Sequence, residues 1–83
     1  MKILYFAWMR QHIGVSNEDI ELPDSVSTVD EMVNWLTARG NGYAKAFDKR
    51  EVIRAAVNQE YVQFDHAISD DDEIAFFPPV TGG

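Results

Sequence analysis

A single strongly amphipathic segment is the feature that most constrains how this chain can fold. Between residues 29 and 39 the apolar residues recur at positions i, i+3, i+4 and i+7, the spacing that lines one face of a helix. The stripe consists of Val29, Met32, Val33 and Leu36. Ser27 and Asp30 have the spacing of a capping box, and Gly40 follows Arg39 as a typical stop signal. The sequence therefore predicts one helix over residues 29–39, with one apolar face to bury.

Segments with the composition of strands lie on both sides of this helix. We expect strands at residues 2–10, 19–22, 52–57, 61–62 and 73–77, and a short helical turn at 43–48 with Phe47 pointing inward. A chain of 83 residues has one modest core, and packing the helix on one face of a mixed sheet buries its stripe most economically. We therefore expect an α+β fold of the β-grasp, ubiquitin-like type, with four to five strands, one main helix, and parallel first and last strands. Residues 1–77 would form the domain and residues 78–83 a flexible tail.

Composition excludes several classes of function. Fourteen acidic residues against seven Lys and Arg give a net charge of −7, which repels phosphate backbones and anionic lipids. We therefore expect neither nucleic acid nor membrane as a partner, and a basic protein groove as a better match.

The absence of cysteine removes disulfides, thiolate nucleophiles and thiolate-held metals, and His12 and His66 are too few for a metal site. The apolar run at residues 3–9 is too short for a signal peptide or a membrane span, which favours a cytoplasmic location.

The face of the sheet away from the helix is expected to carry an apolar patch. Alternate residues of a strand share a face, so charged residues identify the wet side. By this argument Arg54 marks Ile53, Ala55 and Val57 as inward, and Glu73 shares its side with Phe77. Lys2 and Arg10 likewise place Leu4, Phe6 and Trp8 outward, with Tyr61 at the sheet edge. Such a patch usually marks a protein interface; the alternative is that loops or the tail cover it.

The last residues form a proline-stiffened arm that ends in two glycines. Pro78 and Pro79 cannot continue a strand ladder, so the chain should leave the sheet there. Val80, Thr81, Gly82 and Gly83 follow, and two glycines add no functional group except a terminal carboxylate. That carboxylate becomes an acyl donor only after activation, for which ATP and an acyl-adenylate are the expected route. Attack of an amine on the acyl-adenylate would conjugate the chain to another molecule, and attack of a sulfur nucleophile would form a thiocarboxylate. The alternative is that the last residues are a plain disordered end without a function.

Three blocks of sequence carry a resemblance to a known family. Residues 2–7 (KILYFA) with Arg10, residues 56–59 (AVNQ), and the closing residues 71–83 (DDEIAFFPPVTGG) resemble the small, sulfur-carrier subunits of molybdopterin synthase. The resemblance implies that the Gly83 carboxylate is adenylated by an ATP-dependent enzyme and converted to a thiocarboxylate. The tail would then insert into the large subunit and donate sulfur to cyclic pyranopterin monophosphate, which becomes molybdopterin. Two small subunits would flank a dimer of large ones.

The same resemblance assigns roles to individual positions. Gly83 would carry the sulfur and Gly82 would leave clearance for it, while Phe6, Tyr61 and Phe77 match positions that contact the partner. Arg10 also matches a family position, with a less defined role. The catalytic side chains would belong to the large subunit, so the chain is not expected to be an enzyme on its own or to hold a permanent cofactor. A sulfur carrier for thiamin synthesis or tRNA thiolation, a ubiquitin-like protein modifier, and a non-covalent binding module remain the alternatives.

Overall fold

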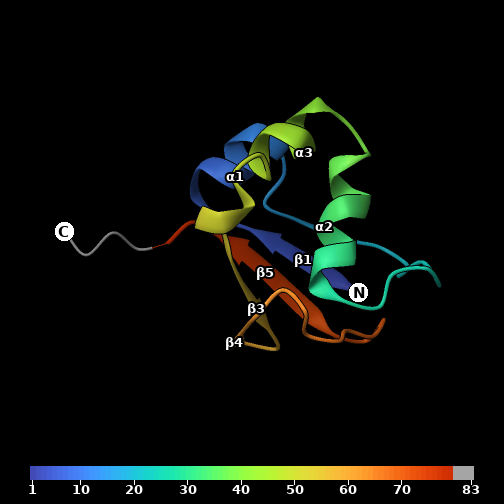
Figure 1. Ribbon diagram of the computed structural model, residues 1–83. Helices are drawn as coiled ribbons and strands as arrows, with labels where there is room; N and C mark the ends of the chain where they lie inside the picture. The colour runs from blue at the N-terminus through green and yellow to red at the C-terminus, as the bar shows by residue number, and fades with distance from the viewer. Residues whose placement is uncertain (80–83) are drawn as a thin grey trace.

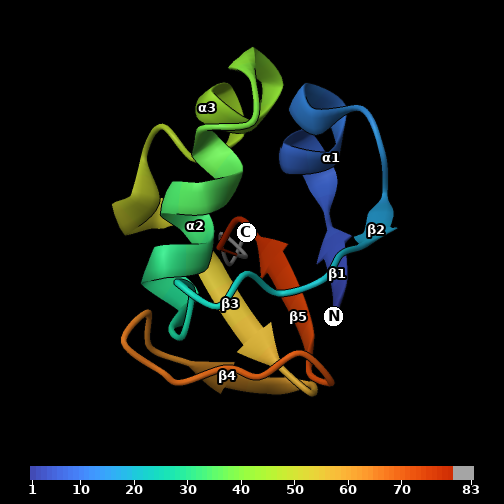
Figure 2. The same ribbon diagram turned by 90° about the vertical axis from the view of Figure 1, so that its right-hand side faces the viewer.

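Three α-helices pack on a five-stranded mixed sheet in the computed structural model, which describes residues 1–79 (Figure 1; Figure 2). The elements are β1 (Lys2–Tyr5), α1 (Ala7–Ile13), β2 (Asn17–Asp19), α2 (Val29–Thr37), α3 (Asn41–Ala46), the 3₁₀ turn η1 (Arg50–Val52), β3 (Arg54–Val57), β4 (Glu60–Val62) and β5 (Glu73–Phe77). The strand order is β2-β1-β5-β3-β4. The predicted tail residues Val80, Thr81, Gly82 and Gly83 lie outside the described residues.

Strand β5 lies at the centre of the sheet and holds its two halves together. It pairs in parallel with β1, where Ile3 lies opposite Ile74, and antiparallel with β3, where Val57 also lies opposite Ile74. The parallel neighbours are thus the first and last strands of the chain. This arrangement, with one main helix over the sheet, is the β-grasp fold expected from the sequence.

Helix α2 supplies the core with the stripe predicted for it. All four stripe residues are fully buried, and they pack with Ile3, Ile74 and Phe76 of the central strands. The capping box is present one residue later than predicted. Thr28 accepts a hydrogen bond from the Glu31 amide at 3.2 Å, and the Glu31 carboxylate accepts one from the Thr28 amide at 3.2 Å. The helix ends at Thr37, close to the predicted end.

The predicted first strand, residues 2–10, is wrong beyond Tyr5. Ala7 has a φ of 55°, a left-handed conformation that turns the chain out of the sheet, and α1 begins there. The helix ends at Ile13 and is capped by Gly14, whose φ is 98° and whose amide donates to the carbonyl of Arg10 at 2.8 Å. Residues 3–9 are almost continuously apolar, and such a run does not distinguish a strand from a buried helix. Trp8 and Arg10 therefore lie on α1 and not on β1.

The other elements differ from prediction mainly at their ends. The second strand is Asn17–Asp19 and not residues 19–22, because Asp19 pairs with Lys2 at the start of β1. The third strand begins at Arg54, since the preceding residues form η1. The helical turn predicted at 43–48 is α3 at Asn41–Ala46. Phe47 points inward as predicted, with its ring 5.0 Å from that of Phe76.

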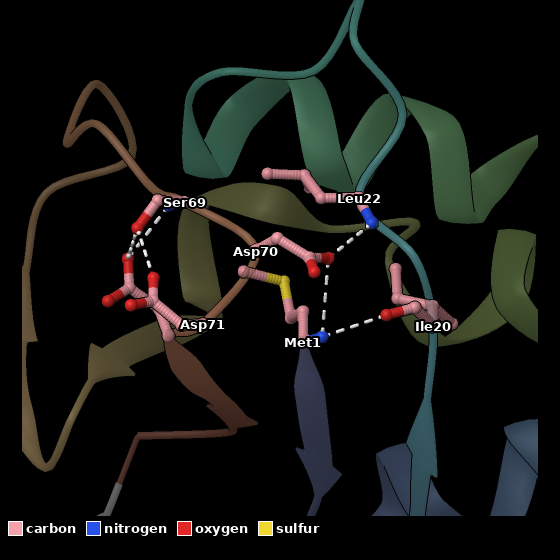
Figure 3. Close-up of polar contacts among 7 residues, drawn as sticks. Met1, Ile20, Leu22, Ser69, Asp70 and Asp71 are labelled. Carbon is pink, nitrogen blue, oxygen red and sulfur yellow. Dashed lines mark hydrogen bonds and ion pairs between the residues drawn. The ribbon is translucent and has the colours of Figure 1, made fainter.

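An acidic turn joins the start of the sheet to the chain that enters β5 (Figure 3). The Asp70 carboxylate accepts a hydrogen bond from the Leu22 amide at 2.7 Å and lies 3.4 Å from the amino nitrogen of Met1. That nitrogen also donates to the carbonyl of Ile20 at 2.8 Å. These contacts hold the segment after β2 against the beginnings of β1 and β5. The turn that the sequence predicts before the last strand therefore also holds the segment that follows the second strand.

The hairpin between β3 and β4 generates a prediction about stability. Its two turn residues, Asn58 and Gln59, have φ values of 51° and 71°, a conformation that suits glycine and is strained for glutamine. Replacing Gln59 by Gly should therefore raise the free energy of unfolding by about 0.5–1 kcal/mol, measured by urea denaturation. Gln63→Gly, at an exposed position with ordinary φ, is the control and should not stabilise. A loss of stability in Gln59→Gly would contradict the explanation.

Candidate functional site

An open apolar groove lies where β5 ends and the chain leaves the sheet. It has a volume of about 460 Å³ and is lined by Phe6, Ala7, Tyr61, Phe77, Pro78 and Pro79. Tyr61 is 80% exposed and Phe6 47% exposed, which is unusual for side chains of this size. The root of the C-terminal arm is thus itself part of the groove wall.

Three elements far apart in the sequence bring the aromatic side chains together. Phe77 is the last residue of β5, and its ring centroid lies 5.4 Å from that of Tyr61 on β4. Phe6 follows β1, and its amide extends the parallel pairing by donating to the carbonyl of Phe76 at 3.2 Å. The left-handed conformation of Ala7 then turns the chain into α1 directly after Phe6. Backbone strain of this kind is found preferentially at functional sites.

The structure brings together in the groove three of the six residues predicted for the interface. Phe6, Tyr61 and Phe77 meet in the groove, with Pro78 and Pro79. Leu4 is half-buried and lies on the helix-free face, because its register neighbours Ala75 and Ala56 continue the row that ends at Tyr61.

Trp8 and Arg10 were assigned to this face by a strand argument that does not hold. Both lie on α1. Trp8 packs half-buried against the core, with its ring 6.1 Å from that of His12, while Arg10 is exposed. Sequence reasoning also missed Ala7 as a lining residue, because nothing in its residue type signals a positive φ.

A second cluster, of polar groups, lies around Glu18 on β2. Its carboxylate accepts hydrogen bonds from the hydroxyls of Tyr5 at 2.8 Å and Tyr43 at 2.7 Å, and from Nη1 of Arg39 at 2.8 Å. The Arg39 guanidinium also lies 5.0 Å from the ring centroids of both Trp35 and Tyr43. The cluster ties the edge strand β2 to the end of α2 and to α3.

Burial and hydrogen bonding act in opposite directions on the pKa of Glu18. Burial raises this pKa, but the hydrogen bonds from Tyr43, Tyr5 and Arg39 outweigh it, so the pKa lies below its ordinary value. Burial, together with the hydrogen bond to Glu18, raises the pKa of the Tyr5 hydroxyl. Both carboxylate oxygens of Glu18 accept hydrogen bonds from these three side chains, so the cluster acts as a structural brace.

The described residues offer little for other kinds of site. Among residues 1–79, no group of three or more His, Cys, Asp or Glu side chains is placed to hold a metal ion. Over the same residues, no helix is long and apolar enough to cross a bilayer.

Comparison with known families decides where the chain belongs. Residues 3–83 match the family model described as the ThiS family. The chain belongs to the ThiS family. This ThiS-family chain is similar to a curated protein, the molybdopterin synthase sulfur carrier subunit of Escherichia coli. The two are 40% identical over 83 residues, which cover 100% of this chain and 99% of the relative.

Solved structures share the fold of this ThiS-family chain. A putative molybdopterin converting factor subunit 1 from Pyrococcus furiosus has a TM-score of 0.76 at 33% identity, with 95% of each chain covered. SAMP1 from Haloferax volcanii has a TM-score of 0.74 at 26% identity, covering 100% of this chain and 98% of that one. One chain in the structure of a complex of subunits 1 and 2 of the molybdopterin-converting factor from Helicobacter pylori shares the fold. Its TM-score is 0.63 at 19% identity, covering 99% of this chain and 96% of that one.

The Glu18 cluster predicts a pH dependence of stability in this ThiS-family chain. Replacing Glu18 by Gln should lower the free energy of unfolding at neutral pH by roughly 1–3 kcal/mol, because hydrogen bonds to a charged acceptor are lost. Since the folded pKa of Glu18 is lowered, its contribution is present above the ordinary value of 4.5 and is lost as the pH falls through the folded value. The native protein should therefore lose more stability than the variant between neutral and acidic pH.

Urea unfolding followed across that pH range measures the difference. Glu21→Gln is the matched control, because Glu21 is exposed and makes no side-chain hydrogen bond within residues 1–79. If the native protein and Glu18→Gln show the same acid dependence, the brace does not depend on the charge of Glu18.

Proposed function

We propose that this ThiS-family chain is the sulfur carrier subunit of molybdopterin synthase and acts in molybdenum cofactor biosynthesis. The observation that carries the proposal is the continuity of the apolar groove with the root of the C-terminal arm. A partner that binds the groove receives the arm at the same time. The full-length similarity to the Escherichia coli sulfur carrier supports the choice of pathway.

The chemistry would take place at the terminal carboxylate of Gly83. A carboxylate oxygen attacks the α-phosphate of ATP on an adenylating enzyme, pyrophosphate leaves, and an acyl-adenylate forms. Hydrosulfide then displaces AMP at the carbonyl carbon and loses its proton, which leaves a thiocarboxylate. With no cysteine in the chain, a sulfur atom carried covalently has no thiol side chain to occupy. Gly82 and Gly83 present no side chain that would crowd this step.

The receiving partner would be the large subunit of molybdopterin synthase, in an assembly of two small and two large subunits. Phe6, Tyr61 and Phe77 would anchor the complex, since exposed aromatic side chains are the usual hot spots of interfaces. Pro78 and Pro79 would direct Val80, Thr81 and the two glycines into the partner's active site. Sulfur would pass there to cyclic pyranopterin monophosphate, with catalytic side chains supplied by the large subunit. The solved complex of the two subunits in Helicobacter pylori supports this choice of partner.

A protein modifier is the second candidate, and the structural similarity to SAMP1, a small archaeal modifier protein, favours it. A modifier would use the same acyl-adenylate but pass its carbonyl carbon to a lysine amine. The two functions share the groove and the arm, and they differ only in the nucleophile that captures the activated end.

Intact-mass spectrometry tests the carrier function. After incubation with an adenylating enzyme of this pathway, ATP and a sulfur donor, the mass should change by the replacement of one oxygen by sulfur. The chain lacking Gly83 is the control and should remain unchanged. Absence of the replacement, under conditions that load the Escherichia coli carrier, would overturn the proposal, and isopeptide adducts in its place would favour the modifier.

Titration against the large subunit tests the docking role of the groove. Tyr61→Ala should weaken binding by about tenfold, because the side chain is 80% exposed in the free chain and is expected to be covered in the complex. Val15→Ala is the matched control, since Val15 is 44% exposed but lies away from the groove, after α1. Equal affinities for Tyr61→Ala and the native chain would show that the groove is not the interface.

A further inference from the structure

Arg54 lies beside the apolar groove but is not among its lining residues. It is the first residue of β3 and lies opposite Phe77 in the register of β3 with β5. Together with Tyr61 it also lines a neighbouring hollow of about 310 Å³ on the β4 side. An exposed cation is therefore in register with one aromatic residue of the groove and shares a hollow with another.

The guanidinium of Arg54 is held on one side only. Its Nη1 donates to the backbone carbonyls of Glu51 at 3.1 Å and Ile53 at 3.3 Å. Within residues 1–79, Nε and Nη2 of Arg54 have no acceptor and no carboxylate lies within 4.0 Å of the group. Arg50, four residues earlier, differs from Arg54 in having a carboxylate partner: its Nη1 lies 2.6 Å from Oδ1 of Asp30. The two carbonyls restrain the side chain of Arg54 and leave its other donors available.

The stretch of sequence that contains Arg54 carries a charge opposite in sign to that of the whole chain. Residues 45–54 hold four of the seven Lys and Arg residues but only two of the fourteen acidic ones. This stretch runs through η1 into β3, where Arg54 lies opposite Phe77, the residue before the root of the C-terminal arm. The opposite end of β5 begins with the acidic turn, residues 70–73. The net charge of −7 thus favours a basic partner, whereas Arg54 itself favours a carboxylate at the groove edge.

We propose that Arg54 is a charged anchor at the edge of the groove and that the partner protein places a carboxylate against it. The proposal rests on the proposed function, because the partner is the protein that accepts the arm. Arginine presents paired donors that match the two oxygens of a carboxylate, and a restrained side chain loses less conformational entropy on binding. Arg54 would fix the orientation of docking, while the aromatic residues supply the apolar contact.

Binding of the large subunit of molybdopterin synthase, followed by calorimetric titration at low and moderate salt, tests this role. Arg54→Ala should raise Kd by about tenfold, and Arg54→Glu should raise it further because like charges would then face each other. Arg54→Lys should lie between native and Ala, since it keeps the charge but loses the paired donors. The salt dependence of Kd should be smaller for Arg54→Ala than for the native chain.

Lys45→Ala is the matched control and should bind as the native chain does. Lys45 is an exposed cation of the same stretch, but it lies on α3 and lines a different hollow together with His12. Thermal unfolding of each variant checks that the fold is unchanged, which is expected because Arg54 is exposed.

The outcomes separate this proposal from the proposed function. If Arg54→Ala and Arg54→Glu bind with native affinity while Tyr61→Ala binds weakly, the groove docks the partner and the role of Arg54 is overturned. If all three bind with native affinity, the docking role of the groove falls as well. Tighter binding of Arg54→Glu would mean that the partner's edge is basic, and would also overturn the proposal. A further outcome would overturn the proposal. If Arg54→Glu weakened the binding of two copies of this chain to each other but left the affinity for the large subunit unchanged, the groove edge would join two copies of this chain.

Discussion

The parallel pairing of β1 with β5 is the interaction on which the rest of the structure depends. It joins residues about 70 positions apart, and the chain between them must close a long loop before the pairing forms. Burial of Ile3, Ile74 and Phe76 against the stripe of α2 offsets that cost. Because the side chains alternate, the same pairing places Leu4 and Ala75 on the opposite face.

The pairing also creates the candidate site. It continues for one residue beyond β1, through the hydrogen bond from the amide of Phe6 to the carbonyl of Phe76. Phe6 is thereby held next to the end of β5, where Tyr61 of the hairpin packs on Phe77. A chain of this size has one modest core, and the groove lies at its surface. Docking and delivery at one end of the sheet are functions that such a small fold can support, with the catalytic groups on a larger partner.

Charged residues of opposite sign lie at the two ends of β5. The acidic turn holds the start of the sheet together through Asp70, and the groove lies at the other end of β5, beside Arg54. Glu18 and its donors brace β2 against α2 and α3 without contributing to the groove. Apolar contact and charge at the groove end of the sheet therefore come from different residues and can be tested separately.

The sequence predicted those parts of the fold that have a local signal. The stripe of α2 follows from periodicity, and its capping box lies one residue from the predicted position. The last strand follows from its branched and aromatic run between an acidic turn and two prolines. Helix α1 was missed because a run of apolar residues fits a strand and a helix equally well, and this error carried Trp8 onto the wrong element. The positive φ of Ala7 and the assembly around Glu18 depend on tertiary contacts, for which residue types offer no local pattern. Three of the six groove-lining residues were predicted as interface residues, and two more as the root of the tail.

The most direct test of the central claim is a map of the surface that the partner covers. Amide chemical shifts of the labelled chain can be followed by NMR during titration with the large subunit of molybdopterin synthase. The account predicts that the changes concentrate at Phe6, Ala7, Tyr61 and Phe77 and leave the amides around Glu18 and Arg39 unaffected. Changes confined to β2, α2 and α3, with the groove residues unperturbed, would contradict it.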